Sequence, residues 1–360
     1  MAIDDVSAAK KQRFVVLDAL RGAAAMMVLI LHTAFIFPSA SLAVDFFFML
    51  SGFVLAHGYG DRLRDGHDRK QFVIARLIRL WPLYLLGCAI ALPACAGMAL
   101  FHWSFWNFKV LLLATVTAPF FILLPYDVFS IPLNPPGWSL SFELMANAVF
   151  LFVGTRLRWA VGMTVAWAAL LVWAVYLYHG GSTGWTSFWG SFPRVFFAFF
   201  CGVLLYRAWQ GQWLPRISVA PWMIILALIA ICAWDPPKHR IYYAVVLLVL
   251  NPMLIWLGAC STARGALERV CVLFGDLSYG VYVLHVPIIM VVEGLRFLLI
   301  SGNAATYVPT GATWWLTQPI ALGVAYVLTY RFDAPVRRAL ARRFLARGAT
   351  KPSVPVSGAA

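Results

Sequence analysis

The sequence predicts an all-α integral membrane protein, a polytopic helical bundle of about ten transmembrane helices. Of its 360 residues, 62% are hydrophobic and only 12% are charged, against about 25% charged residues in an ordinary soluble domain. The mean hydropathy is +0.81. The chain also contains 16 tryptophans, 13 tyrosines and 27 phenylalanines, and such aromatic enrichment is typical of proteins with many membrane–water interfaces.

Apolar segments that are long enough, or nearly long enough, to cross a bilayer recur along the chain. They lie at about 15–37, 42–59, 72–100, 107–124, 138–154, 159–178, 191–209, 217–234, 241–260, 271–299 and 311–330. We therefore expect an N-terminal tail over 1–14, one membrane domain over 15–335 and a basic C-terminal tail over 336–360.

Arginine and lysine gather in short loops between these segments and in both tails, as expected on the cytoplasmic side. Those in the loops are Arg62, Arg64, Arg69, Lys70, Arg156, Arg158, Arg207, Arg216, Arg264 and Arg269. The distribution predicts a multi-pass protein of a bacterial-type inner (plasma) membrane with both termini in the cytoplasm. Because an odd number of crossings would separate the termini, one segment should not cross. We expect 107–124, which contains Lys109 and Pro119, to lie in or re-enter the outer interface.

The formal net charge of +14 does not indicate a nucleic-acid-binding protein, because the basic residues form no patch interleaved with aromatic residues. All six cysteines lie in or beside apolar segments, with no CxxC pair and no histidine at a metal-ligand spacing. They are expected to pack as small apolar side chains. No metal site is predicted.

Several ionisable residues lie inside the apolar segments, where a charged side chain costs from about +2.5 to more than +10 kcal/mol. Arg21 and His32 both belong to the first segment, about 16 Å apart along a helix. The expected orientation brings Arg21, Arg76 and Arg79 together near the cytoplasmic side. Residues retained at such a cost are candidates for a functional site.

Near the outer side, the same orientation places His32, Asp45 and Glu143, so that one histidine and two carboxylates are expected to meet. Three further polar residues share one face of the segment 271–299 at i, i+4 and i+7, namely Ser278, Tyr282 and His285. That face is expected to point into the bundle.

Each of these residues also has a purely structural interpretation. Asp18 and Arg21 are three residues apart and can simply pair. Arg76 and Arg79 can bind lipid head groups, and His32 can be an interhelical hydrogen-bond donor. The two carboxylates can be solvated at the interface.

Five motifs occur in order between about 15 and 335. They are Leu17-Asp18-Ala-Leu-Arg21-Gly22 followed by His32, Val44-Asp45-Phe-Phe-Phe-Met-Leu-Ser51-Gly52-Phe53, Arg76-Leu-Ile-Arg79-Leu-Trp-Pro82, Pro136-Gly-Trp138-Ser139-Leu-Ser-Phe-Glu143 and Gly275-Asp-Leu-Ser278-Tyr279-Gly-Val-Tyr282-Val-Leu-His285. Together they resemble the family-3 membrane acyltransferases, integral-membrane carbohydrate O-acyltransferases. One such motif alone is weak evidence for a family, whereas five motifs in this order are specific evidence.

The chain departs from this family in two respects. It has Phe332-Asp333-Ala-Pro335 where the family commonly has Phe-Glu-x-Pro. Some members continue into an extracytoplasmic esterase-like domain, whereas this sequence ends at Ala360 after a basic tail. The membrane domain is therefore expected to pass the acyl group to its acceptor unaided.

The resemblance implies transfer of an acetyl or other short acyl group from cytoplasmic acyl-CoA to a hydroxyl of an extracytoplasmic or cell-envelope carbohydrate. Arg21, Arg76 and Arg79 would bind the donor phosphates as permanently charged, bidentate partners. His285 would bind the donor or relay protons. Acyl-CoA would be a co-substrate, and the oligomeric state is left open.

His32 is the first candidate for general base, because imidazole titrates near neutral pH. Asp45 or Glu143 would fix its tautomer, and Glu143 is the next candidate base. Donors for the developing oxyanion, or contacts to substrate, are expected from Trp138, Ser139, Ser278 and Tyr282. With no cysteine near this outer site, direct transfer is favoured, although a serine or histidine intermediate is not excluded.

The alternative function is a proton-coupled secondary transporter of an anionic solute, in which the intramembrane ionisable residues would form a proton relay. Transporters commonly contain repeats with broken helices in matching positions. The Arg21-x10-His32 segment has no counterpart in the second half of this chain. The acyltransferase hypothesis is therefore preferred.

Overall fold

The computed structural model describes residues 12–34, 36–64, 69–101, 106–125, 129–154, 156–178, 188–236, 239–296, 299 and 311–345. The predicted tails lie largely outside this part of the chain. Where the structure is described it is helical and contains no strand.

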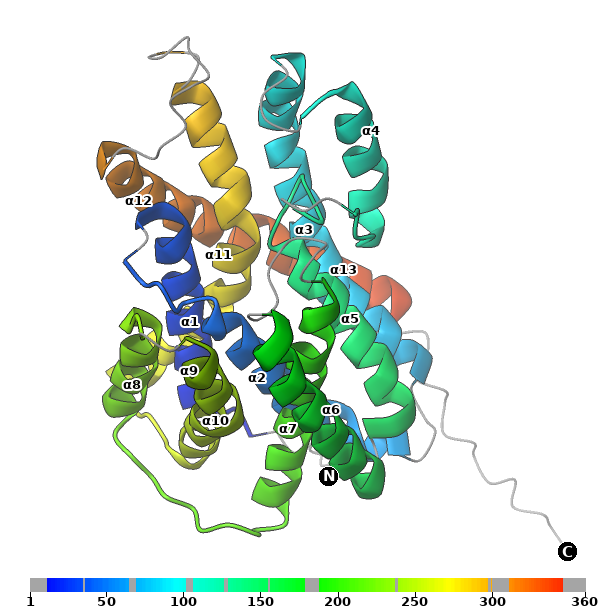
Figure 1. Cartoon of the computed structure of the whole chain (residues 1–360), viewed down its shortest axis with the longest axis vertical. Helices are drawn as coiled ribbons and strands as arrows, with labels where there is room; N and C mark the ends of the chain where they lie inside the picture. Colours follow the sequence, from blue (N-terminus) through cyan, green and yellow to red (C-terminus); the bar gives the residue numbers. More distant parts are fainter. Residues whose placement is uncertain are drawn as a thin grey trace, which may run out of the picture.

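The helices form one bundle (Figure 1), joined in places by short 3₁₀ or π segments labelled η. In order they are α1 (Val15–Ala34), α2 (Leu42–Arg64), α3 (Arg69–Leu100), α4 (Phe108–Thr117), η1 (Ala118–Phe120), α5 (Gly137–Val149), η2 (Phe150–Gly154), α6 (Leu157–Tyr178), α7 (Phe188–Gln210), α8 (Pro221–Ala233), α9 (His239–Val245), η4 (Val246–Leu250), α10 (Asn251–Cys260), α11 (Ala266–Arg296), α12 (Gly311–Leu328), η7 (Thr329–Asp333) and α13 (Ala334–Phe344).

Seven of the described helices are long and apolar enough to cross a membrane. They span Val15–Ala34, Leu42–Leu63, Arg69–Leu100, Gly137–Gly154, Phe188–Gln210, Arg240–Cys260 and Ala266–Arg296. Three shorter apolar helices accompany them, over Phe108–Phe120, Leu157–Trp173 and Pro221–Ala233. The prediction of a polytopic helical membrane protein is therefore confirmed. The count of about ten crossings, the orientation and the domain limits stay predictions.

Helix α1 packs along α11 at the centre of the bundle. The two backbones approach closely, because a Cβ atom on Gly22 would lie 2.5 Å from the Cβ of Phe274, and one on Gly275 would lie 2.5 Å from the Cβ of Asp18. Small residues at helix interfaces allow this approach in a bilayer. The contact fixes Arg21, next to Gly22, against α11.

Helices α2 and α7 make a second close contact through glycine. A Cβ atom on Gly52 would lie 1.9 Å from the carbonyl oxygen of Phe199, and one on Gly202 would lie 1.9 Å from that of Met49. Each obstacle is rigid backbone rather than a movable side chain. This interface therefore requires glycine at both positions.

Helix α4 runs beside the far end of α3 (Figure 1) and is followed by irregular chain that leads to α5. With ten residues, α4 is about 15 Å long, too short to cross a hydrocarbon core of about 30 Å alone. From Ser130 to Pro136 the irregular chain is buried, and hydrogen bonds from side chains join this region to its neighbours. Tyr84 donates to the carbonyl of Ala118 at 2.9 Å, and Asn134 donates to that of Val283 at 3.1 Å. Helix α5 therefore begins inside the bundle.

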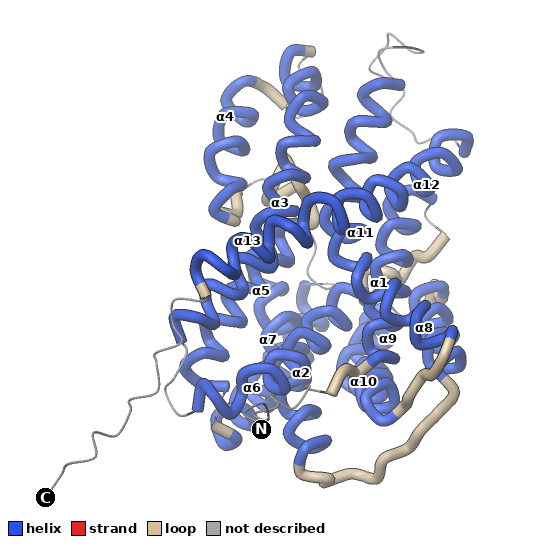
Figure 2. Tube along the Cα trace, turned by 180° about the vertical axis from the view of Figure 1, so that it is seen from behind, coloured by secondary structure: helices blue, strands red, loops and turns tan. Residues whose placement is uncertain are grey.

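Helix α12 continues through η7 into α13, which crosses the first half of α3 (Figure 2). Described side chains of α13 are half-buried or exposed, and its sequence is rich in arginine. This helix covers one end of the functional site.

Replacing Gly52 by alanine should force α2 and α7 apart, because the new methyl group meets the Phe199 carbonyl. Overpacking of this kind costs about 1–3 kcal/mol. Thermal unfolding in detergent micelles, followed by the folded fraction on size exclusion, should show Gly52→Ala unfolding at a lower temperature than wild type. Gly162→Ala is the matched control, because a Cβ atom there meets nothing within 4 Å. Equal stability of the two variants would contradict the close packing.

Candidate functional site

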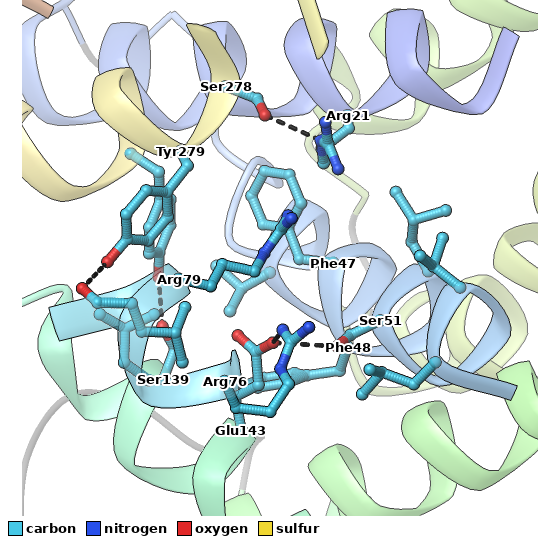
Figure 3. Close-up of a pocket in the computed structure, with 17 residues that line it drawn as sticks. Arg21, Phe47, Phe48, Ser51, Arg76, Arg79, Ser139, Glu143, Ser278 and Tyr279 are labelled. Carbon is cyan, nitrogen blue, oxygen red and sulfur yellow. Dashed lines mark hydrogen bonds and ion pairs between the residues drawn. The ribbon is translucent and has the colours of Figure 1, made fainter. Parts of the chain in front are cut away.

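A cavity of about 100 Å³ lies between α1, α2, α3, α5 and α11 (Figure 3). We call it the inner cavity. Its polar lining includes Arg21, Arg76, Arg79, Ser51, Ser139, Glu143, Ser278 and Tyr282. Phenylalanines and leucines form most of its remaining wall, among them Phe47, Phe48, Leu50, Leu55 and Leu80. The predicted convergence of three arginines is therefore confirmed, because all three line one cavity.

Arg21 is held by α1 and α11 together. Its guanidinium pairs with Asp18 at 3.0 Å and donates to the hydroxyl of Ser278 at 2.8 Å and to the carbonyl of Gly275 at 2.7 Å. The expected Asp18–Arg21 pair is present. Arg21 is thus oriented by the protein before any ligand enters.

Arg76 and Glu143 form a second polar contact across the inner cavity. The Arg76 Nη2 atom lies 3.2 Å from Glu143 Oε1, and the Ser51 hydroxyl donates to the same carboxylate oxygen at 2.9 Å. The prediction that Glu143 meets His32 is therefore wrong. It assumed that α5 begins at the outer membrane boundary, whereas α5 begins inside the bundle after buried irregular chain and brings Glu143 to the arginines.

Arg79 differs from its two neighbours because its guanidinium has no protein partner within the described part of the chain. It extends between Arg21 and the Arg76–Glu143 pair (Figure 3). The described acidic groups nearby are already paired with other cations. A half-buried guanidinium without a counter-charge is a candidate site for an anion.

Asp45 lies away from His32 and forms a buried ion pair with Arg194 of α7, which corrects the predicted meeting of Asp45 and His32. The Arg194 Nη2 atom is 2.6 Å from Asp45 Oδ2, and its Nε atom is 3.1 Å from Oδ1. Asp45 is only 1% exposed. Sequence reasoning missed Arg194, although an arginine inside the segment 191–209 was the same signal that identified Arg21.

His32 and His285 face each other, with ring centroids 5.0 Å apart. The Nδ1 atom of His32 lies 2.8 Å from the Val28 carbonyl, and that of His285 lies 2.7 Å from the Tyr282 carbonyl. Since a carbonyl oxygen only accepts, both Nδ1 atoms are assigned the hydrogen. Backbone carbonyls, and not Asp45 or Glu143, therefore fix the tautomers. Each Nε2 atom keeps a lone pair.

The two histidines differ in access. His32 is exposed, whereas His285 is completely buried and its Nε2 atom has no hydrogen-bond partner. The predicted shared face of α11 is confirmed as buried, since Ser278 and Tyr282 are 3% and 6% exposed. Of the two histidines, His32 is therefore the one that is open to the outside of the bundle.

Tyr282 connects the inner cavity with the histidines. It lines the cavity, its hydroxyl lies 2.7 Å from the Ser139 hydroxyl, and its ring centroid is 6.0 Å from that of His285. Ser139 donates to the Pro136 carbonyl at 2.9 Å, so Tyr282 is the donor to Ser139. Ser139 and Tyr282 thus both line the cavity, and their role as oxyanion donors stays a prediction. Trp138 packs against Phe48 and Phe142 and is not part of the lining.

The described residues contain no group of three or more His, Cys, Asp or Glu side chains placed to hold a metal ion. All six cysteines are free.

The sequence profile of a family described as "Acyltransferase domain" matches residues 14–332. "Protein 2 in picA locus" of Rhizobium radiobacter is 38% identical over 169 residues, which cover 42% of this chain and 87% of that protein. No solved structure matches significantly. The resemblance seen in the five motifs is therefore confirmed over almost the same stretch of chain.

Asp45→Asn should destabilise the protein, because it removes the carboxylate from a buried guanidinium. Breaking a buried pair in this way costs about 3–5 kcal/mol. The double variant Asp45→Asn, Arg194→Gln should recover part of that loss, since no unpaired charge remains. Thermal unfolding in lipid nanodiscs measures both effects. An Asp45→Asn protein as stable as wild type but without catalytic activity would instead indicate a chemical role for Asp45.

Proposed function

The chain belongs to the family-3 membrane acyltransferases, and from this premise we propose that it transfers a short acyl group from cytoplasmic acyl-CoA to a hydroxyl of an extracytoplasmic carbohydrate. The observation that carries the proposal is Arg79, a cation without a counter-charge in the described part of the chain, on a cavity whose lining residue Tyr282 packs against His285. The proposal also places the protein in a bacterial-type inner membrane with cytoplasmic termini.

The donor phosphates suit the arginine end of the inner cavity. A pyrophosphate presents several anionic oxygens, and a guanidinium can bind two of them in a fork. Arg21 and Arg76 are held in place by carboxylates of their own, so they line the cavity in fixed orientations. Arg79 is free to make the direct contact.

The remainder of the inner cavity suits a flexible chain. Its volume of about 100 Å³ is below the roughly 300–1,000 Å³ of sites that enclose a whole small molecule. Its largely apolar wall would accept a slender arm such as pantetheine. The arm would carry the thioester past Tyr282 toward the histidines, away from the charged phosphates.

The reaction needs a base, an electrophile and a leaving group in one place. His32 Nε2 takes the proton of the acceptor hydroxyl, and the hydroxyl oxygen attacks the thioester carbonyl carbon. As the new C–O bond forms, the C–S bond breaks, and the CoA thiolate leaves and acquires a proton. The Tyr282 hydroxyl can turn from Ser139 to the developing oxyanion.

Glu143 and His285 have supporting parts in this proposal. Glu143 balances the charge of Arg76 and limits repulsion among the three arginines. His285 offers an unpartnered Nε2 atom beside His32 and can accept a proton or a ligand hydrogen bond there. No covalent acyl-enzyme is required.

Substituting His32 by alanine should lower transfer by roughly 10²–10⁴-fold, the usual contribution of a general base, while the protein still inserts and folds. Membranes incubated with radiolabelled acetyl-CoA, or another labelled acyl-CoA, are assayed for label in chloroform-insoluble polysaccharide. His57→Ala is a suitable control, because His57 contacts the Gln12 carbonyl and Tyr206, away from the cavity. Full activity of His32→Ala would remove His32 as the base.

The substitution Arg79→Lys keeps the positive charge but loses the guanidinium fork. It should raise the KM for acyl-CoA by roughly tenfold, equivalent to about 1.4 kcal/mol, with a smaller change in kcat. Steady-state kinetics in nanodiscs separate the two parameters. Arg69→Lys is the matched control at the start of the same helix, where Arg69 stacks on Phe152. A fall in kcat with unchanged KM would argue against donor binding by Arg79.

A further inference from the structure

A second cavity of about 480 Å³ adjoins the inner cavity, with which it shares Arg21, Arg79 and Tyr279. We call it the vestibule. Its volume falls within the range of roughly 300–1,000 Å³ typical of small-molecule sites. Unlike the inner cavity, it is large enough for a ring system.

The wall of the vestibule is built from α1, α3, α11, η7 and α13. Helix α13 contributes Arg337 and Arg338, which lie beyond the family match that ends at residue 332. Neither residue belongs to the motifs read from the sequence. These two arginines therefore lie outside the matched stretch, whereas the rest of the wall is mostly inside it.

The charges in the vestibule are not balanced. Arg337 pairs with Asp333 at 3.0 Å. Arg338 donates through Nε to the Ala334 carbonyl at 3.1 Å, and its guanidinium has no carboxylate partner in the described part of the chain. Arg79, at the junction of the two cavities, is also without a counter-charge. Two cations are thus available at separate points, one on α13 and one at the junction.

Asp333 supplies a different kind of partner. It is 2% exposed, and its Oδ1 atom is buried without a hydrogen-bond donor. A buried acceptor of this kind is costly when left unpaired. A ligand with a hydrogen-bond donor, such as an aromatic amine, would satisfy it.

We propose that the vestibule binds the 3′-phosphoadenosine end of the acyl-CoA donor, with Arg338 of α13 as the partner of the 3′-phosphate. This inference rests on the proposed function. The pyrophosphate then lies at Arg79, the pantetheine arm enters the inner cavity, and the adenine amino group reaches Asp333. The sizes of the two cavities determine which end of acyl-CoA lies in which cavity, because a nucleotide fits the vestibule and not the inner cavity.

The test compares the binding of CoA with that of 3′-dephospho-CoA by titration calorimetry of the whole protein in phosphatidylcholine nanodiscs. Wild type should bind CoA at least roughly tenfold more tightly, the effect of about 1.4 kcal/mol. Arg338→Gln should lower the CoA affinity to that of dephospho-CoA and leave the latter unchanged. Arg342→Gln is the matched control, since Arg342 lies on the same helix and does not line the vestibule. The Arg342→Gln variant should still bind CoA more tightly than 3′-dephospho-CoA.

Three results would overturn the inference while leaving the proposed function intact. The first is equal binding of CoA and 3′-dephospho-CoA by wild type. The second is an Arg338→Gln variant that still binds CoA more tightly than 3′-dephospho-CoA. The third is an Arg342→Gln variant that loses as much CoA affinity as Arg338→Gln, which would indicate a general charge effect. Loss of the preference when phosphatidylglycerol is added to the nanodiscs would assign the vestibule to a lipid phosphate instead. Absence of binding of either ligand to wild type would refute acyl-CoA as the donor and with it the proposed function.

Discussion

The arrangement of this protein depends on one constraint: a charge inside an apolar helix bundle needs a partner, and three contacts of this kind join different helices. Asp45 and Arg194 join α2 to α7, Arg76 and Glu143 join α3 to α5, and Arg21 joins α1 to α11 through Ser278 and the Gly275 carbonyl. Because desolvated charges are expensive, each contact restricts how two helices can be rotated and shifted. Apart from α7, all the helices that these contacts join line the inner cavity.

Arg79 is the exception to this rule. It shares a helix with Arg76, but its guanidinium is left without a carboxylate in the described part of the chain. An unbalanced cation lowers the stability of the empty protein and favours a bound anion. In the proposed function the donor phosphates supply the missing charge.

The buried irregular chain before α5 has an equally large effect. It interrupts the apolar pattern with prolines and is joined to its neighbours by hydrogen bonds, because Asn134 donates to the Val283 carbonyl of α11 and Ser141 of α5 donates to the Phe121 carbonyl. Non-helical backbone at membrane depth is tolerated only when it is enclosed in this way. Its consequence is that α5 begins inside the bundle, so that Ser139 reaches Tyr282 and, one helical turn later, Glu143 reaches Arg76. The position at which α5 begins therefore places both Glu143 in the charged part of the site and Ser139 in its hydroxyl-bearing part.

The sequence by itself determined the helical membrane fold, the family and most of the residues that line the inner cavity. Hydropathy, helical spacing and short motifs are local properties, and they require no knowledge of neighbours. Arg21, Arg76, Arg79, Tyr282 and Ser139 were all identified in this way. The i, i+4, i+7 face of α11 was predicted correctly because a helix fixes which residues share a side.

Only the tertiary structure decided which polar groups meet. The sequence placed Asp45 and Glu143 beside His32, whereas the bundle pairs them with Arg194 and Arg76 and leaves His32 with His285. The reason is physical: pairing depends on the depth at which a helix begins and on its rotation about its axis, and close glycine contacts and buried irregular chain set both. Those quantities arise from packing between segments far apart in the chain.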